Sequence, residues 1–418
     1  MLNRRQLLSG AGMALGALSL PKRAQAAAPA DTCFLFVFAQ GGWDPTRVLA
    51  TPFGNRNVSM EAAAERATAG GISYVDHPDR PAVRSFFDAY HARSVVLNGL
   101  MVRSIAHEIC TLIAMTGTTS GVSPDWPAII AARDSGRYTL PQLVLGGPSF
   151  PGTLGSVVAR TGSSGQLEAL ISGQALSWSD TPTSGPMGPS EALIDRYLAR
   201  RAAARADFAK KGTDGPLTRD FASAAEHMRQ LKDLQYVMDF TGGADLASQA
   251  EVACDALELG ITRCVTLSAS NGALGWDTHT NNDNDQSMLW QDLFDGLNQL
   301  MTRLDATPGP AGGTLAEQTV VVVLSEMGRT PMLNGFNGKD HWPYTSVLMM
   351  GSGLAGDRVV GDFDSNFYGK LVDPATADVV EEGPSLSSES LGATLLAMAD
   401  IDPEDYVSGV SPLDGILL

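Results

Sequence analysis

The sequence predicts an α/β fold of the doubly wound type, with a mainly parallel sheet. Short apolar runs without polar alternation recur along the chain, as expected for strands that are buried on both faces. A long amphipathic helix separates two of these runs, which is the strand–helix–strand order of a parallel crossover. A hydrophobic content of 44% with only 18% charged residues is typical of a globular protein.

The predicted strands are apolar runs of strand length, beginning with TCFLFVFA. They cover residues 32–39, 94–98, 142–145, 263–268, 319–325 and 346–350. Between the fourth and fifth runs, apolar residues recur at three- and four-residue steps from Met288 to Leu304, which predicts the crossover helix. In sheets of this type ligands bind at the carboxyl ends of the strands.

Residues 148–255 interrupt this alternation and are interpreted as a helical insertion or cap within one domain of residues 27–418. A Gly/Ser/Pro-rich stretch at 162–190 precedes Ala/Arg-rich sequence at 191–211 and 219–240, which predicts helices.

The first 26 residues predict a twin-arginine export signal. Arg4 and Arg5 precede an apolar stretch, and Ala24-Gln25-Ala26 is a small-residue cleavage site. A membrane anchor is the alternative, but the apolar run is short and glycine-rich for a span. We therefore expect a periplasmic or secreted protein that partners the twin-arginine translocase during export and has no stable membrane span in its mature form.

The charge balance argues against nucleic acid as a partner. The whole chain carries a formal charge of −17, and the signal holds four basic residues and no acid, so the mature chain is nearer −21. A general nucleic-acid binder needs a basic face instead. Four cysteines in a chain of this size do not form a disulfide framework, and buried thiols are expected, with a Cys254–Cys264 bridge as the alternative.

Polar residues cluster just after the predicted strands, where a ligand would bind. The carboxylates and imidazoles there suit divalent metal ions, Zn, Mn, Fe, Mg or Ca, at one or two sites. The predicted metal ligands are Asp44, Asp277, His279, Glu326, Asp340 and His341, and the guanidinium of Arg329 is predicted to bind a tetrahedral oxyanion. Simpler interpretations remain open: Asp44 could cap a turn, Glu326 could cap a helix or pair with Arg329, and Asp340-His341 could be a polar loop.

Four segments together resemble a known family. FVFAQGGWD, GWDTHTNN, SEMGRTP and DHW are similar to the twin-arginine-exported family called domain of unknown function 1501, which is related to sulfatases within the alkaline phosphatase superfamily. The resemblance implies an alkaline-phosphatase-like, three-layer αβα core with a mainly parallel sheet. It also implies that Asp44, Asp277, His279, Glu326 and His341 are metal ligands.

Two positions depart from the superfamily pattern. In the stretch HEICTLIAMTG, His107 occupies the place where the resemblance implies a Ser, Thr or Cys nucleophile, and the nearest hydroxyl is that of Ser104. His107 is therefore a candidate catalytic residue, as a base or phosphohistidine-type nucleophile, a third imidazole ligand, or a structural histidine at a helix start. The second departure is Met327, where the superfamily often has a His beside its carboxylate, which weakens the expectation of a two-zinc site.

Three functions follow from these observations. The first is an exported metal-dependent hydrolase, with phosphate or sulfate esters, free or on a surface, as substrates. The second is a non-catalytic metal-binding member of the superfamily with a structural or assembly role. The third is a phosphomutase-like transferase, which export disfavours because phosphorylated metabolites are mostly intracellular.

Overall fold

The computed structural model describes residues 28–161, 243–269 and 274–418. Between 162 and 242 it describes only residues 167, 174–175, 183–184, 188–209, 221, 225, 230, 231, 234 and 238–240. The predicted export signal lies outside the described residues. The predicted insertion is described in part, and its described elements include the short strands β7 (Gln174–Ala175) and β8 (Thr183–Ser184) and helix α5 (Gly188–Ala209).

The central feature is an eight-stranded sheet in the order β14-β4-β13-β10-β1-β9-β5-β6. Each of the six apolar runs forms one of its strands: β1 (Cys33–Phe38), β4 (Ser94–Met101), β5 (Gln142–Val144), β9 (Cys264–Ser268), β10 (Thr319–Leu324) and β13 (Tyr344–Gly351). The edges are completed by β6 (Val158–Arg160) and β14 (Arg358–Val360). The predicted α/β class with a mainly parallel sheet is confirmed.

Strand β13 is the exception to parallel pairing. It runs antiparallel to both of its neighbours, β10 and β4, while β1 pairs in parallel with β10 and β9. The start of β13 therefore lies at the edge of the sheet where the parallel strands end. Residues that come just before β13 thus reach the same edge as residues that follow β1, β9 and β10.

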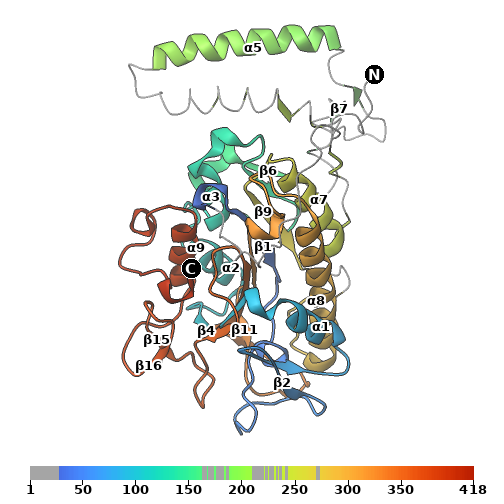
Figure 1. The fold of residues 1–418 in the computed structure, drawn as a ribbon, viewed down its shortest axis with the longest axis vertical. Coiled ribbons are helices and arrows are strands. Elements are labelled where there is room, and N and C mark those ends of the chain that lie inside the picture. Colours follow the sequence, from blue (N-terminus) through green and yellow to red (C-terminus); the bar gives the residue numbers. More distant parts are fainter. Residues whose placement is uncertain are drawn as a thin grey trace, which may run out of the picture.

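Helices cover both faces of the sheet, as the three-layer arrangement requires (Figure 1). One face packs against α1 (Pro81–Tyr90), α7 (Leu246–Glu258) and α8 (Asn282–Ala306), the predicted crossover helix between β9 and β10. The other face packs against α2 (His107–Thr116), α3 (Trp126–Arg133) and α9 (Ser388–Met398). Side chains of β1 alternate between the two cores, with Leu35 in the first and Phe36 in the second, so the run is apolar throughout because both faces are buried.

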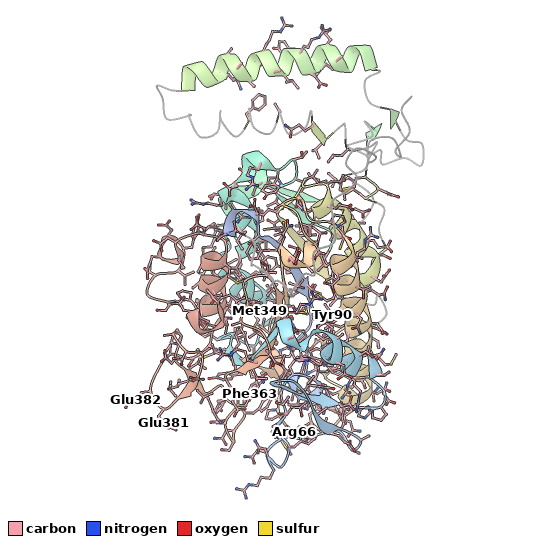
Figure 2. The ribbon with its side chains drawn as sticks, viewed as in Figure 1. Arg66, Tyr90, Met349, Phe363, Glu381 and Glu382 are labelled. Carbon is pink, nitrogen blue, oxygen red and sulfur yellow. The ribbon has the colours of Figure 1, made fainter. Side chains whose placement is uncertain are left out.

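The remaining strands form small two-stranded sheets that are separate from the central sheet. These pair β2 (Glu65–Ala69) with β3 (Ile72–Asp76), β11 (Gly328–Arg329) with β12 (His341–Trp342), and β15 (Leu371–Val372) with β16 (Val379–Val380). Figure 2 shows the labelled Met349 of β13 in the middle of the molecule, with Glu381 and Glu382 at its margin. All four cysteines are buried and unpaired.

Among the residues that the structure describes, no helix is long and apolar enough to cross a membrane.

Candidate metal centre

Three histidines converge on the carboxylate of Asp277 at the carboxyl edge of the sheet. His279 Nε2 lies 3.1 Å and His341 Nε2 3.2 Å from Asp277 Oδ1, and His107 Nε2 lies 3.4 Å from Oδ2. The Nε2 atoms of His279 and His341 are 2.9 Å apart. The structure thus brings together three of the predicted ligands, Asp277, His279 and His341, and places His107 beside them.

Three segments far apart in the chain contribute these side chains. Asp277 and His279 follow β9, and His107 begins α2 after β4. His341 precedes the antiparallel β13, whose start lies at this edge, and β12 pairs it with Arg329 of β11. Parallel strands with one reversed neighbour therefore explain how residues 107 to 341 meet at one place.

An acceptor holds the Nδ1 atom of each imidazole on its far side. Nδ1 lies 2.8 Å from Glu326 Oε1 in His107, 3.0 Å from Asp340 Oδ1 in His279 and 2.7 Å from the carbonyl oxygen of Ile105 in His341. A carbonyl or an ionised carboxylate can only accept, so each Nδ1 carries the donated proton. In the neutral imidazoles all three Nε2 atoms therefore present lone pairs toward Asp277.

This donor set fits a cation. In the neutral state, the lone pairs of His279 Nε2 and His341 Nε2 lie 2.9 Å apart and repel each other, and a cation between them would relieve this repulsion. His107 Nε2 is buried without a hydrogen-bond partner, so its lone pair is available to coordinate a metal ion. One ligand atom each from His107, Asp277 and His341 lies within 4.8 Å of the others, which is compatible with a shared ion.

The chemistry of the donors narrows the metal. Imidazole nitrogens with one carboxylate suit borderline ions such as Zn, Mn or Fe. Mg and Ca prefer sites built from oxygen ligands. Of the ions predicted from the sequence, the first three fit these residues better.

Glu326 lies behind His107 rather than among the converging atoms. Its side chain is fully buried, and Oε1 accepts hydrogen bonds from the backbone N–H of Gly41 at 2.8 Å and from His107, while Oε2 accepts one from Ser325. The hydrogen bond that His107 donates to Glu326 is the main cause that raises the pKa of His107. Such carboxylate–histidine pairs orient metal ligands and strengthen their basicity. The placement favours positioning of His107 over the direct ligation predicted for Glu326.

Asp340 has the corresponding place behind His279. Its side chain is 60% exposed, and Oδ1 accepts from His279 Nδ1 and from the side-chain amide of Asn334. The hydrogen bond from His279 is the main cause that lowers the pKa of Asp340. This arrangement, too, favours orientation of an imidazole over direct ligation.

Arg329, the predicted oxyanion-binding residue, is fully buried and holds Asp277. Its Nη2 lies 2.6 Å from Asp277 Oδ1, and its other contacts are the carbonyl oxygens of Gly41, Gly42 and Lys339. Partial burial would raise the pKa of Asp277, but the hydrogen bond and charge of Arg329, with the nearby imidazoles, hold it below its usual value. Because these donors are occupied, the geometry favours a positioning role over capture of a substrate oxyanion.

Asp44 is placed differently from the other predicted ligands. It is fully buried and caps the 3-10 turn Pro45–Arg47, and its carboxylate pairs with Lys339 and Arg47. Burial would raise the pKa of Asp44, but these two positive charges hold it well below its usual range. Among the described residues, its contacts include no imidazole.

Sequence reasoning missed three residues that support the centre: Ile105, Asn282 and Lys339. Ile105 acts through its backbone carbonyl, which any residue type supplies, so no sequence signal marks it. Lys339 directly precedes Asp340-His341, and Asn282 ends the motif GWDTHTNN. Only these neighbouring positions could have drawn attention to them.

Replacing Glu326 with Gln is expected to weaken metal binding about 10-fold, the lower end of the usual effect of such supporting residues. Gln keeps an oxygen that can accept from Gly41 and His107 but removes the charge that strengthens the imidazole. Competition with a chromophoric chelator measures this affinity. The control is Glu317→Gln, a carboxylate of a capping box just before β10, which should leave metal binding unchanged. Metal binding by E326Q as tight as that of the native protein would contradict this role.

The sequence model of a protein family described as "Protein of unknown function (DUF1501)" matches residues 82–414. The chain belongs to this family. The membership predicted from sequence motifs is thereby confirmed, with three of the four motifs inside the matched residues and FVFAQGGWD before them. No curated protein matches this DUF1501 chain in sequence.

Several solved structures resemble this DUF1501 protein. A phosphonate monoester hydrolase of Agrobacterium radiobacter is 11% identical, with 91% of this chain and 78% of that chain covered at a TM-score of 0.35. A sulfatase from Pseudoalteromonas sp., PsFucS1, is 8% identical, with 93% and 72% covered at a TM-score of 0.34. BT4656, solved with its substrate D-glucosamine-2-N,6-O-disulfate, is 11% identical, with 91% and 79% covered at a TM-score of 0.37.

Proposed function

We propose that this DUF1501 protein is an exported metal-dependent hydrolase that acts on phosphate or sulfate esters. The observation that carries the proposal is the convergence of three Nε2 atoms on Asp277, each with its Nδ1 held by an acceptor. His107, His341 and Asp277 would hold the ion, with His279, whose Nε2 lies 2.9 Å from that of His341, as a further candidate ligand. A divalent cation there would supply Lewis acidity and lower the pKa of bound water toward neutrality.

Exposure of the centre supports a catalytic rather than a purely structural metal. The side chains of Asp277 and His279 are each 45% exposed, so water and a substrate can reach them. Structural metal sites are instead closed by their protein ligands. The buried groups Glu326 and Arg329 hold His107 and Asp277 from behind and leave the outer side open.

Water is the proposed attacking group. His107 stands where a side-chain nucleophile is expected from the family resemblance and has no oxygen to offer. Its Nδ1 donates to Glu326, so its Nε2 is committed to the centre. These residues therefore bind and orient, and they leave the attack on the ester to a solvent molecule.

A non-catalytic metal-binding role is the second candidate, and the surroundings of Arg329 favour it. Its guanidinium is taken up by Asp277 and three backbone carbonyls, which leaves the proposed hydrolase dependent on the metal for binding the ester oxyanion. A structural or assembly protein would need no side chain that binds an ester oxyanion.

Metal content and turnover distinguish the two candidates. The mature protein is purified, its metal is measured by mass spectrometry, and aryl phosphate, phosphonate and sulfate esters are tested before and after chelation and with Zn, Mn or Fe added back. We expect about one ion per chain and turnover that chelation removes and the metal restores. Metal without turnover on any ester would support the second candidate. Protein that neither contains nor takes up metal would overturn both.

Export through the twin-arginine pathway to the periplasm or beyond is part of the same proposal. It is supported by the paired Arg4-Arg5 and the small-residue cleavage site at residues 24–26. Replacing both arginines with lysine is expected to leave the uncleaved precursor in the cytoplasm, as measured by cell fractionation. Normal export of that variant would contradict the pathway.

A further inference from the structure

A buried carboxylate next to the metal centre has all of its hydrogen-bonding capacity in use. Asp44 Oδ2 lies 2.8 Å from Lys339 Nζ, 2.9 Å from Asn282 Nδ2 and 3.3 Å from Arg47 Nε. Its Oδ1 accepts from the hydroxyl of Thr46 at 2.7 Å and from the Thr46 N–H at 3.1 Å. With Asp44 and Lys339 both fully buried, neither charge has solvent to stabilise it.

Lys339 links this carboxylate to the segment that carries His341. It lies two residues before His341 in the chain. Its N–H donates to the carbonyl of Thr278 at 3.0 Å, and its own carbonyl accepts from Arg329, the residue that holds Asp277. A shift of Lys339 would therefore move the His341 segment and disturb the segment of Asp277 and His279.

Two amide side chains link Asp44 to the Asp277–His279 segment from the other side. Asn282 donates to Asp44 and accepts from the hydroxyl of Thr278 at 2.7 Å. Gln286 accepts from the Asp44 N–H at 2.9 Å and donates to the carbonyl of Trp276 at 3.0 Å. The residues on both sides of Asp277 are thus connected to Asp44.

We propose that Asp44 is a positioning residue, which through Lys339, Asn282 and Gln286 sets the distance between the two segments that carry Asp277, His279 and His341. This inference rests on the proposed metal centre and replaces the ligand role predicted for Asp44. An ion pair suits the task because buried opposite charges tolerate little separation. The four donors from Lys339, Asn282 and Thr46 use the lone pairs of the Asp44 carboxylate, which leaves none for a metal ion.

Cobalt(II) titration of the mature protein tests this role, because the visible absorption of bound Co²⁺ reports both affinity and coordination. The variants are Asp44→Asn and Lys339→Met. We expect each to bind Co²⁺ about 10- to 100-fold more weakly, as is usual when a supporting residue is lost. At saturation the absorption spectrum should match that of the native protein, since the ligands are unchanged.

Two further variants separate positioning from general destabilisation. Asp125→Asn is the matched control: Asp125 is also a fully buried acid, but it caps α3, and its loss should lower stability without changing Co²⁺ affinity. The double variant Asp44→Leu/Lys339→Met removes both charges, so it should fold even if a single variant does not. It should still bind Co²⁺ about 10- to 100-fold more weakly.

The outcomes against the proposal are distinct. A changed spectrum in D44N with native or tighter affinity in K339M would make Asp44 a ligand that Lys339 competes for. Native affinity in the single variants and the double variant would remove any positioning role. A native protein that binds no Co²⁺ would instead overturn the metal centre itself, and the inference with it.

Discussion

Replacing Asp277 with Asn should lower metal affinity by at least about 100-fold, beyond the range seen for supporting residues, and should abolish ester hydrolysis. Asp277 is the carboxylate on which the Nε2 atoms of all three histidines converge. Asn keeps the size of the side chain and an oxygen for Arg329, so the change removes charge rather than packing. Metal content after dialysis and chelator competition measure the loss.

The control for this variant is Asp340→Asn. Asp340 is an acid of the same centre that contacts only the far side of His279 among the imidazoles, and its side chain is 60% exposed. We expect at most about a 10-fold loss there, because solvent can replace an exposed supporting group. An equal loss of metal affinity in D277N and D340N would mean that Asp277 contributes no more to metal binding than a supporting residue does. Retention of metal by D277N would exclude Asp277 as a ligand.

Gly338→Ala should displace the His279 segment and weaken both folding and metal binding. A Cβ atom at residue 338 would lie 1.8 Å from the carbonyl oxygen and 1.9 Å from the carbonyl carbon of His279, and 2.4 Å from the nitrogen of Thr280. These are backbone atoms, so no change of rotamer can relieve the overlap. We expect a loss of about 2–3 kcal/mol in the free energy of unfolding and a fall of about 10- to 100-fold in metal affinity. Denaturant unfolding and chelator competition measure the two.

Gly335→Ala is the matched control, three residues away in the same loop. A Cβ atom there meets nothing within 4 Å. Its stability should stay within about 0.5 kcal/mol of the native value, with unchanged metal affinity. If G338A behaved like G335A, the two segments would not be in the close contact that the structure describes.

The principal strands of the fold could be predicted because strands that are buried on both faces consist of continuous apolar residues. Residues 320–324 are apolar at every position, as expected for a strand that is covered on both faces. The crossover helix α8 has a clear three- and four-residue period. The edge strands β6 and β14 could not be predicted in this way, since each has three residues and is only partly buried. The reversed direction of β13 depends on its pairing with β10 and β4, about which its own residues carry no information.

The candidate site could be predicted only at the level of residue types and their place after strands. Asp277, His279 and His341 were expected together and lie together. Glu326, Asp340 and Asp44 have the same chemistry in the sequence, but the structure places the first two behind imidazoles and the third in an ion pair with Lys339. A carboxylate that could bind a metal and one that orients a histidine differ only in what surrounds them.

The sequence alone determined the α/β class, the family and the edge of the sheet where chemistry gathers, because apolar periodicity and strand-end motifs are local properties of the chain. Only the tertiary structure decided which acids face the three histidines. That choice depends on distances of about 3 Å between segments as far apart as His107 and His341. Such distances follow from strand order, from the reversal of β13 and from buried partners such as Lys339 and Arg329. None of these is encoded next to the residues that it positions.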